Sequence, residues 1–262
     1  MLSGKPQAAD VLPLLRNSQA AGYNAALRIE PIRREVVNLE LAKYIDHTLL
    51  NPNAQRADIT KLCNEAKENN FFAVCVNPCH VRQAVKELSS SSVVVATVVG
   101  FPLGANLTDV KIAEAQKAIS EGAEEIDMVI NIGALKDGDI ALVTDEIKAI
   151  VKVAKDHLVK VILETDLLTD EEKIAATKAC IQAKAHMVKT STGFVKDGKG
   201  ATVEDIKLIR QTLADAPLGI KASGGIRDIE KAKALIEAGA TRLGTSSGVS
   251  LVKGTAPVTA AY

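Results

Sequence analysis

Short apolar runs alternate along the chain with longer segments that carry charged residues at helical spacing. We predict strands at 43–49, 71–76, 92–100, 124–130, 159–165, 186–192, 218–224 and 242–247. Helical segments lie between them, including 56–69, 79–89, 109–121, 138–156, 170–184, 202–214 and 228–238. One unit takes roughly 28 residues, close to the length of a βαβ step. The alternation therefore predicts an α/β domain with a parallel sheet.

Local signals support the helix boundaries. Thr202 precedes Glu204 and Asp205, which predicts a helix start with an acidic first turn. Gly122 and Gly239 follow helical runs and predict their C-terminal ends, because glycine adopts the left-handed conformation that terminates many helices.

The number of repeats decides between two α/β folds. A doubly wound open sheet usually has fewer strands and a glycine fingerprint after the first strand, which is missing here. Eight units fit the (β/α)8 TIM barrel, whose usual size is about 250 residues. We predict a single barrel domain over residues 37–254. Residues 1–36 are expected to be a helical or flexible N-terminal extension, with a transit peptide as the alternative, and residues 255–262 a flexible tail.

Composition narrows the class of protein further. The 262 residues are 47% hydrophobic but only 3% aromatic, which suits helices packed on a parallel sheet. Lys plus Arg and Asp plus Glu number 32 each, so net charge favours neither a nucleic acid nor a membrane surface as a partner. No apolar stretch approaches the length of a transmembrane helix. The four cysteines form no framework, which indicates reduced thiols and a cytoplasmic protein.

Two lysines interrupt apolar strands. Lys189 follows Met187 and Val188, and Lys221 follows Ile220 one strand later. A lysine is rarely buried unless it pairs with an opposite charge or takes part in function. A charged side chain on a barrel strand can do either where it points into the barrel mouth. Two ammonium groups held close together disfavour each other's charge, so one of them is expected to become a neutral, nucleophilic amine.

Two carboxylates are placed to assist these lysines. Asp127 lies between Ile126 and Met128 in an apolar run; it is either a structural ion-pair partner or a proton shuttle. Asp46 near the end of the first strand is either a packing carboxylate or a supporting residue of the same site. The neighbouring His47 has no second histidine at ligand spacing, so a metal site has weak support.

Glycine-rich segments follow the last two strands. Ser223, Gly224 and Gly225 precede a helix, and the run from Gly244 to Gly248 follows the eighth strand. Either segment alone could be an ordinary tight turn. At these two positions of a barrel, however, exposed backbone N–H groups commonly bind phosphate. A nucleophilic amine, a second cation, a carboxylate and a phosphate site together predict aldol cleavage of a phosphosugar through a Schiff base.

Several motifs resemble the deoxyribose-phosphate aldolase family of class I aldolases. They are Ile45–Leu50, Val74–Pro78, Gly100–Gly104, Glu125–Val129, Val188–Phe194 and Ile220–Arg227. The resemblance covers about residues 40 to 254 and implies reversible cleavage of 2-deoxy-D-ribose 5-phosphate to acetaldehyde and D-glyceraldehyde 3-phosphate. It implies Lys189 as the Schiff-base lysine, Lys221 as the group that lowers its pKa, and Asp127 as the proton donor or acceptor. Neither a metal nor a cofactor is expected.

The resemblance also implies a wider set of site residues and partners. The expected catalytic residues are Lys189, Lys221, Asp127, Asp46 and the terminal Tyr262. The expected substrate-binding residues are Thr48, Cys75, Thr190, Gly193, Ser223, Gly224, Gly225, Gly244, Ser246 and Ser247. Phe194 stands where some members of the family carry a basic residue, so backbone amides would do more of the phosphate binding. The expected partners are phosphosugar and aldehyde substrates. Further copies of the chain are also expected, in a homodimer or homotetramer.

Two other functions remain open at this point. A related phosphate-binding barrel could be an isomerase or a transaldolase-like transferase, which would share the phosphate site without requiring Lys189, Lys221 and Asp127 together. A non-catalytic phosphosugar sensor or scaffold, docking partners through residues 1–36, would have no use for a neutral lysine.

Overall fold

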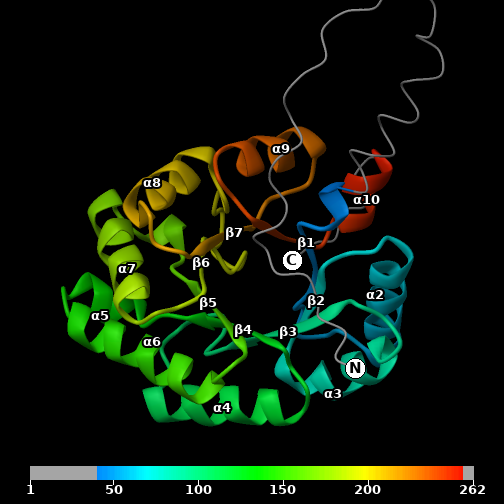
Figure 1. Ribbon diagram of the computed structural model, residues 1–262, viewed down its shortest axis with the longest axis horizontal. Coiled ribbons are helices and arrows are strands. Elements are labelled where there is room, and N and C mark those ends of the chain that lie inside the picture. The colour runs from blue at the N-terminus through cyan, green and yellow to red at the C-terminus, as the bar shows by residue number, and fades with distance from the viewer. Residues whose placement is uncertain (1–39, 256–262) are drawn as a thin grey trace, which may run out of the picture. The chain divides into compact units, whose positions relative to one another are not determined.

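Eight parallel strands close into a barrel in the computed structural model, which describes residues 40–255 (Figure 1). The strands are β1 (Ile45–Leu49), β2 (Ala73–Val76), β3 (Val94–Val99), β4 (Glu125–Val129), β5 (Leu158–Ile162), β6 (Met187–Lys189), β7 (Gly219–Ser223) and β8 (Arg242–Thr245). Their order follows the chain, and β1 pairs with β8 to complete the barrel. The predicted (β/α)8 fold is confirmed, and the open doubly wound sheet is wrong.

Helices form a ring outside the strands (Figure 1). They are α2 (Arg56–Glu68), α3 (Val81–Leu88), α4 (Thr108–Ser120), α5 (Ile132–Lys136), α6 (Ile140–Ala154), α7 (Asp170–Gln182), α8 (Val203–Leu213), α9 (Ile229–Glu237) and α10 (Gly248–Lys253), with 3-10 turns η2 (Pro78–His80) and η3 (Thr165–Leu167). Each helical segment named from the sequence contains a helix. The two short helices α5 and α10 were not predicted, because about one and a half turns give too few positions for a hydrophobic period.

The boundary signals hold in detail. The side chain of Thr202 accepts a hydrogen bond from the N–H of Asp205 and caps α8. Gly122 and Gly239 follow α4 and α9 with φ of +104° and +118°, in which an L side chain would be strained. The predicted strands are longer than the observed ones at several ends; β6, for example, stops at Lys189. Thr190 still donates its N–H to the carbonyl of Lys221 on β7, whereas Thr192 donates to Glu164 in the loop after β5.

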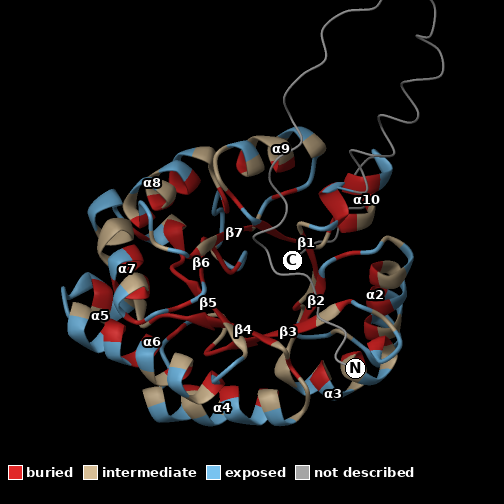
Figure 2. Cartoon of the chain, viewed as in Figure 1, coloured by how far each residue is buried: buried red, intermediate tan, exposed pale blue. Residues whose placement is uncertain are grey.

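Aliphatic side chains fill the layer between the barrel and the helices. The strands are coloured almost entirely as buried in Figure 2. Burying each such side chain contributes about 1.5–3 kcal/mol, which makes this layer the main source of stability. A second, smaller apolar cluster consists of Leu50, Cys75, Ala96 and Val98 with Phe101 packed on it. It brings together residues from the β1–β3 side of the chain.

The predictions for residues 1–36, for the tail after Thr255 and for Tyr262 concern parts of the chain that lie outside the described residues. Within residues 40–255, no helix is long and apolar enough to cross a membrane.

Candidate active site

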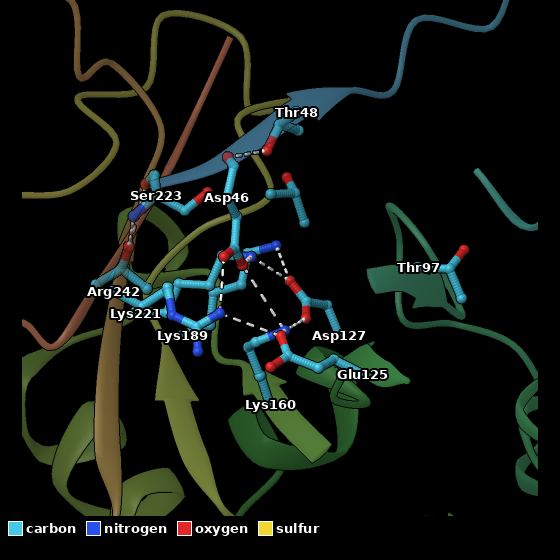
Figure 3. Close-up of polar contacts among 12 residues, drawn as sticks. Asp46, Thr48, Thr97, Glu125, Asp127, Lys160, Lys189, Lys221, Ser223 and Arg242 are labelled. Atoms are coloured by element: carbon cyan, nitrogen blue, oxygen red, sulfur yellow. Dashed lines mark hydrogen bonds and ion pairs between the residues drawn. The ribbon is translucent and has the colours of Figure 1, made fainter. Parts of the chain in front are cut away.

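Seven charged side chains meet inside the barrel, away from the outer hydrophobic layer (Figure 3). They are Asp46 on β1, Glu125 and Asp127 on β4, Lys160 on β5, Lys189 on β6, Lys221 on β7 and Arg242 on β8. Alternate residues of a strand point to the same face, which is why Glu125 and Asp127 both reach the interior. The pairing register aligns Lys189 with Lys221 and Asp127 with Lys160.

Asp127 lies at the centre of this charged cluster. Its Oδ2 atom accepts hydrogen bonds from Lys189 Nζ and Lys221 Nζ, each at 2.8 Å. Its Oδ1 atom accepts from Lys160 Nζ at 2.6 Å. This geometry is compatible with both interpretations of Asp127 from the sequence, a structural ion-pair partner and a proton shuttle, because its carboxylate contacts both predicted lysines.

The remaining carboxylates are paired just as closely. Asp46 Oδ2 accepts a hydrogen bond from Lys221 Nζ, and Asp46 Oδ1 lies 2.8 Å from Arg242 NH1. Glu125 Oε2 lies 2.6 Å from Lys160 Nζ and 3.2 Å from the same guanidinium nitrogen. The guanidinium also stacks on the ring of Phe72, 3.5 Å from its centroid.

Burial and ion pairing shift the pKa values of the clustered side chains in different directions. Burial alone would raise the pKa of Asp127, but Lys160, Lys189 and Lys221 hold it well below its usual range. Asp46 also has a lowered pKa, because Arg242 and Lys221 outweigh its burial. Burial lowers the pKa of Lys221, yet Asp127 and Asp46 raise it above the ordinary lysine value.

Lys189 differs from the other two lysines. Burial lowers its pKa, Asp127 opposes this, and the charge of Lys221 lowers it further. Lys189 contacts one carboxylate, whereas Lys160 and Lys221 each contact at least two. Its side chain retains 2% exposure, while the other two have none. Of the three, Lys189 is therefore the lysine that loses its proton most easily.

Cys75 borders the charged cluster on its apolar side. The thiol is fully buried between Leu50, Ala96 and Val98, and burial together with Asp127 raises its pKa. Its burial agrees with the interpretation of Cys75 as a small buried hydrophobe, and its role as a wall of the substrate pocket stays a prediction.

Three glycines converge where the loops after β6 and β7 meet. A Cβ on Gly224 would lie 3.1 Å from Gly200 Cα and 3.7 Å from Gly193 Cα. All three have positive φ, and Gly225 follows with φ of +66°. Within residues 40–255, the N–H groups of Gly193, Gly224 and Gly225 donate no hydrogen bond, so they remain open to an acceptor.

The predicted residues of β8 fall into two groups. Gly244 lies within the strand, and a Cβ there would be 3.0 Å from Lys221 Cε and 2.8 Å from Ser223 Oγ. The absence of a side chain at Gly244 therefore makes room for Lys221. Ser246 is half-buried after the strand, and Ser247 donates its N–H to Thr245 Oγ1 at 2.9 Å.

Two predicted hydroxyls are engaged with the backbone. Thr190 Oγ1 donates to the carbonyl of Ser223 and accepts from its N–H, which ties β6 to β7. Thr48 Oγ1 donates to the carbonyl of Asp46 at 2.9 Å. Both residues stand beside the cluster, but their hydroxyls already stabilise the strands that carry it.

Sequence reasoning missed Lys160, Glu125 and Arg242. A signal existed for Lys160, which sits between Val159 and Val161 in the same apolar setting as Lys189. Glu125 and Arg242 are each the first residue of a strand, where a charged residue normally faces solvent; only barrel closure turns them inward.

Carboxylates after β5 brace the loop that follows β6. Glu164 is buried with a left-handed backbone (φ 62°, ψ 64°), an unusual state for a residue other than glycine. It accepts hydrogen bonds from the N–H and hydroxyl of Thr192, and burial raises its pKa. Asp166 accepts from the N–H groups of Lys199 and Gly200. These contacts hold Gly200 against Gly224.

A lysine outside the charged cluster and a pair of aromatic rings lie at the end of the barrel that carries the glycine loops. A Cβ on Gly225 would be 3.3 Å from Lys231 Nζ, a lysine that the sequence analysis did not select. The ring of Phe194 packs edge-on against Phe101, with centroids 5.1 Å apart. Lys231 thus brings a positive charge to the glycine loops that Phe194 does not supply.

His47 is not part of the cluster. Its ring faces α2, where Nε2 lies 2.7 Å from Glu65 Oε2, and it packs against the ring of Phe71 at an angle of 57°. No group of three or more His, Cys, Asp or Glu side chains in the described part of the chain could hold a metal ion.

Comparison with known proteins adds a family to this geometry. The model of the DeoC/LacD family of aldolases matches residues 40–254. A protein of Bdellovibrio bacteriovorus named deoxyribose-phosphate aldolase is 56% identical over 216 residues, which are 82% of this chain and 97% of the relative.

Solved structures agree with the sequence relatives. A putative deoxyribose-phosphate aldolase from Coccidioides immitis superposes with a TM-score of 0.80 at 43% identity, covering 82% of this chain and 85% of that one. Deoxyribose phosphate aldolase from Aeropyrum pernix, described as having a unique tetrameric structure, gives a TM-score of 0.78 at 32% identity and covers 87% and 97% of the two chains.

Proposed function

Since the chain belongs to the DeoC/LacD family of aldolases, we propose that it is a deoxyribose-phosphate aldolase that works through a Schiff base on Lys189. The reaction is the reversible cleavage of 2-deoxy-D-ribose 5-phosphate to acetaldehyde and D-glyceraldehyde 3-phosphate. The observation that carries the proposal is the pair Lys189 and Lys221 on one carboxylate oxygen, with the pKa of Lys189 lowered and that of Lys221 raised.

Neutral Lys189 attacks C1 of the open-chain sugar, and loss of water forms the iminium ion. The C3 hydroxyl then gives up its proton and the C2–C3 bond breaks. Its electron pair flows to the iminium nitrogen and leaves an enamine, while D-glyceraldehyde 3-phosphate departs. Protonation at C2 and hydrolysis by water release acetaldehyde and restore the amine.

Asp127 and Lys221 carry the protons in this proposal. Asp127 stays ionised beside Lys189, so it can accept a proton from a water molecule at the C3 hydroxyl. Lys221 stays protonated and stabilises the negative charge that develops at the substrate oxygen. Asp46 supports Lys221 from the opposite side.

The phosphate binds at the glycine loops. The open N–H groups of Gly193, Gly224 and Gly225 favour this position, because several backbone donors pointing at one place form an anion site. In this proposal Ser246 and Ser247, which follow β8, also bind the phosphate, and Lys231 beside Gly225 adds a positive charge. The small apolar wall at Cys75 receives the two-carbon fragment that becomes acetaldehyde.

Borohydride trapping tests the proposal. The protein is incubated with acetaldehyde, reduced and digested, and the adduct is located by mass spectrometry. We expect a reduced two-carbon adduct on Lys189 and none in Lys189→Leu. Turnover in the presence of EDTA tests the expectation that no metal takes part. A protein that cleaves deoxyribose 5-phosphate without forming this adduct would refute the Schiff-base assignment.

The assembly and compartment are further parts of the proposal. Of the expected homodimer or homotetramer, the solved structure from Aeropyrum pernix supports the tetramer, and light scattering on the purified chain would measure the assembly. The free cysteines Cys63, Cys75, Cys79 and Cys180 are compatible with the reducing cytoplasm.

A further inference from the structure

Lys160 has no part in the steps proposed above, yet it is completely buried beside the reacting groups. Its Nζ atom lies 2.6 Å from Asp127 Oδ1, 2.6 Å from Glu125 Oε2 and 3.8 Å from Asp46 Oδ2. Burial lowers its pKa, but Asp127 and Glu125 raise it above the ordinary lysine value. Lys160 is therefore a permanent cation that binds carboxylates from two strands.

The contact with Asp127 decides which way this carboxylate faces. Lys160 occupies the Oδ1 atom, which leaves Oδ2 for Lys189 and Lys221. Figure 3 shows Asp127 between Lys160 on one side and the two other lysines on the other. Without Lys160, Asp127 Oδ1 would be a buried acceptor that lacks a hydrogen-bond donor. The carboxylate could then rotate so that both oxygens face Lys189.

The charges of the cluster support a second effect. Three carboxylates (Asp46, Glu125 and Asp127) are matched in number by Lys160, Lys221 and Arg242. Lys189 is the surplus cation, so its proton is the one whose loss makes the cluster neutral. Of the other titratable groups that act on Lys189, Cys75 stays neutral, and Glu164 in the neighbouring loop is left unaltered in the variants compared below.

We propose that Lys160 is a positioning residue for Lys189: it orients Asp127 and balances the carboxylates, so that Lys189 is free to react as a neutral amine. This inference rests on the proposed Schiff-base function and adds to it a third lysine, one strand away from the nucleophile, that never touches the substrate.

The pH dependence of borohydride trapping with acetaldehyde tests the inference. In Lys160→Met, the cluster loses a positive charge, so Lys189 keeps its proton to higher pH and the midpoint of trapping rises by about one unit or more. In Glu125→Gln, the cluster loses a negative charge, so the midpoint falls. The double variant Lys160→Met/Glu125→Gln removes one charge of each sign and returns the midpoint close to that of the wild type. Lys207→Met, on the exposed face of α8, is the control without a shift.

A structural role alone would give a different pattern. It would lower the amount of adduct in both single variants and lower it further in the double variant, with no movement of the midpoint; that result would overturn the inference. Circular dichroism checks folding, and if Lys160→Met does not fold, Lys160→Arg with an unshifted midpoint and Glu125→Gln with a lowered one decide the question. Absence of an adduct in the wild type would instead refute the proposed function.

Discussion

Lys189 and Lys221 face each other in register on β6 and β7, and both nitrogens lie 2.8 Å from the same oxygen of Asp127. The shared acceptor does not treat them equally. Asp46 gives Lys221 a second carboxylate, whereas among residues 40–255 Lys189 pairs with Asp127 alone. Burial is the largest influence on the pKa of Lys189, and the charge of Lys221 adds to it. Desolvation thus ranks ahead of the neighbouring cation that the sequence analysis emphasised.

Replacement of the nucleophile should separate chemistry from folding. We expect Lys189→Leu to show no turnover of deoxyribose 5-phosphate and to unfold at a temperature no lower than the wild type, because it removes the surplus cation and leaves the other carboxylates paired. Steady-state kinetics and thermal unfolding measure the two effects. The exposed residue Lys207 provides the control Lys207→Leu, which should keep full activity. Appreciable turnover by Lys189→Leu would contradict the assignment.

The pH profile should have an acidic limb that belongs to Lys189. Because the pKa of Lys189 is lowered, the free amine forms below the usual lysine pKa of about 10.4. Activity is therefore lost as the pH falls through this lowered pKa and Lys189 takes up a proton. Lys221, whose pKa is raised, remains charged across the same range. A rate that kept rising until the ordinary lysine pKa would show that the amine is not activated.

Asp127→Asn should damage both activity and stability. The amide keeps the shape but leaves three buried lysines around a neutral group. We expect turnover to fall by about 10²–10⁴-fold, as for loss of a general acid or base. We expect the free energy of unfolding to fall by about 3–5 kcal/mol, because one partner of a buried ion cluster is lost. Kinetics and urea unfolding provide the measurements; an Asn variant with normal turnover would assign Asp127 a purely structural role.

Lys231 should affect phosphorylated substrates only. In Lys231→Met, we expect KM for deoxyribose 5-phosphate to rise by about tenfold, equivalent to about 1.4 kcal/mol, while turnover of unphosphorylated deoxyribose stays the same. Lys233 lies two residues further along α9 and pairs with Glu230, so Lys233→Met is the matched control. Equal effects of Lys231→Met on both substrates would place the phosphate elsewhere.

Glu164→Gln should loosen the loop after β6. A glutamine cannot accept all the hydrogen bonds that Thr192 donates, and it adds an N–H2 group facing those donors. We expect the free energy of unfolding to fall by about 1–3 kcal/mol, with a higher KM for the phosphorylated sugar. Glu171→Gln, on the exposed start of α7, should change neither quantity. A normal KM in Glu164→Gln would separate this loop from phosphate binding.

Much of this site was visible in the order of the residues. Lys189, Lys221 and Asp127 stood out because each is a charged residue in an apolar strand, and a barrel leaves such a side chain only the interior. Lys160 met the same criterion and was overlooked. Glu125 and Arg242 gave no comparable signal, since the first residue of a strand is charged in many proteins for no reason but solubility. Lys231 looked like any lysine on a helix.

The sequence by itself determined the eightfold alternation, the barrel it implies and the lysines that interrupt its strands, because periodicity and apolar context act over a few neighbouring residues. Only the tertiary structure decided how those charges share partners. Asp46 and Arg242 are separated by most of the chain, yet barrel closure places them 2.8 Å apart and commits Asp46 to Arg242 and Lys221. Lys189 is left with one carboxylate, a consequence of strand closure that no local pattern encodes.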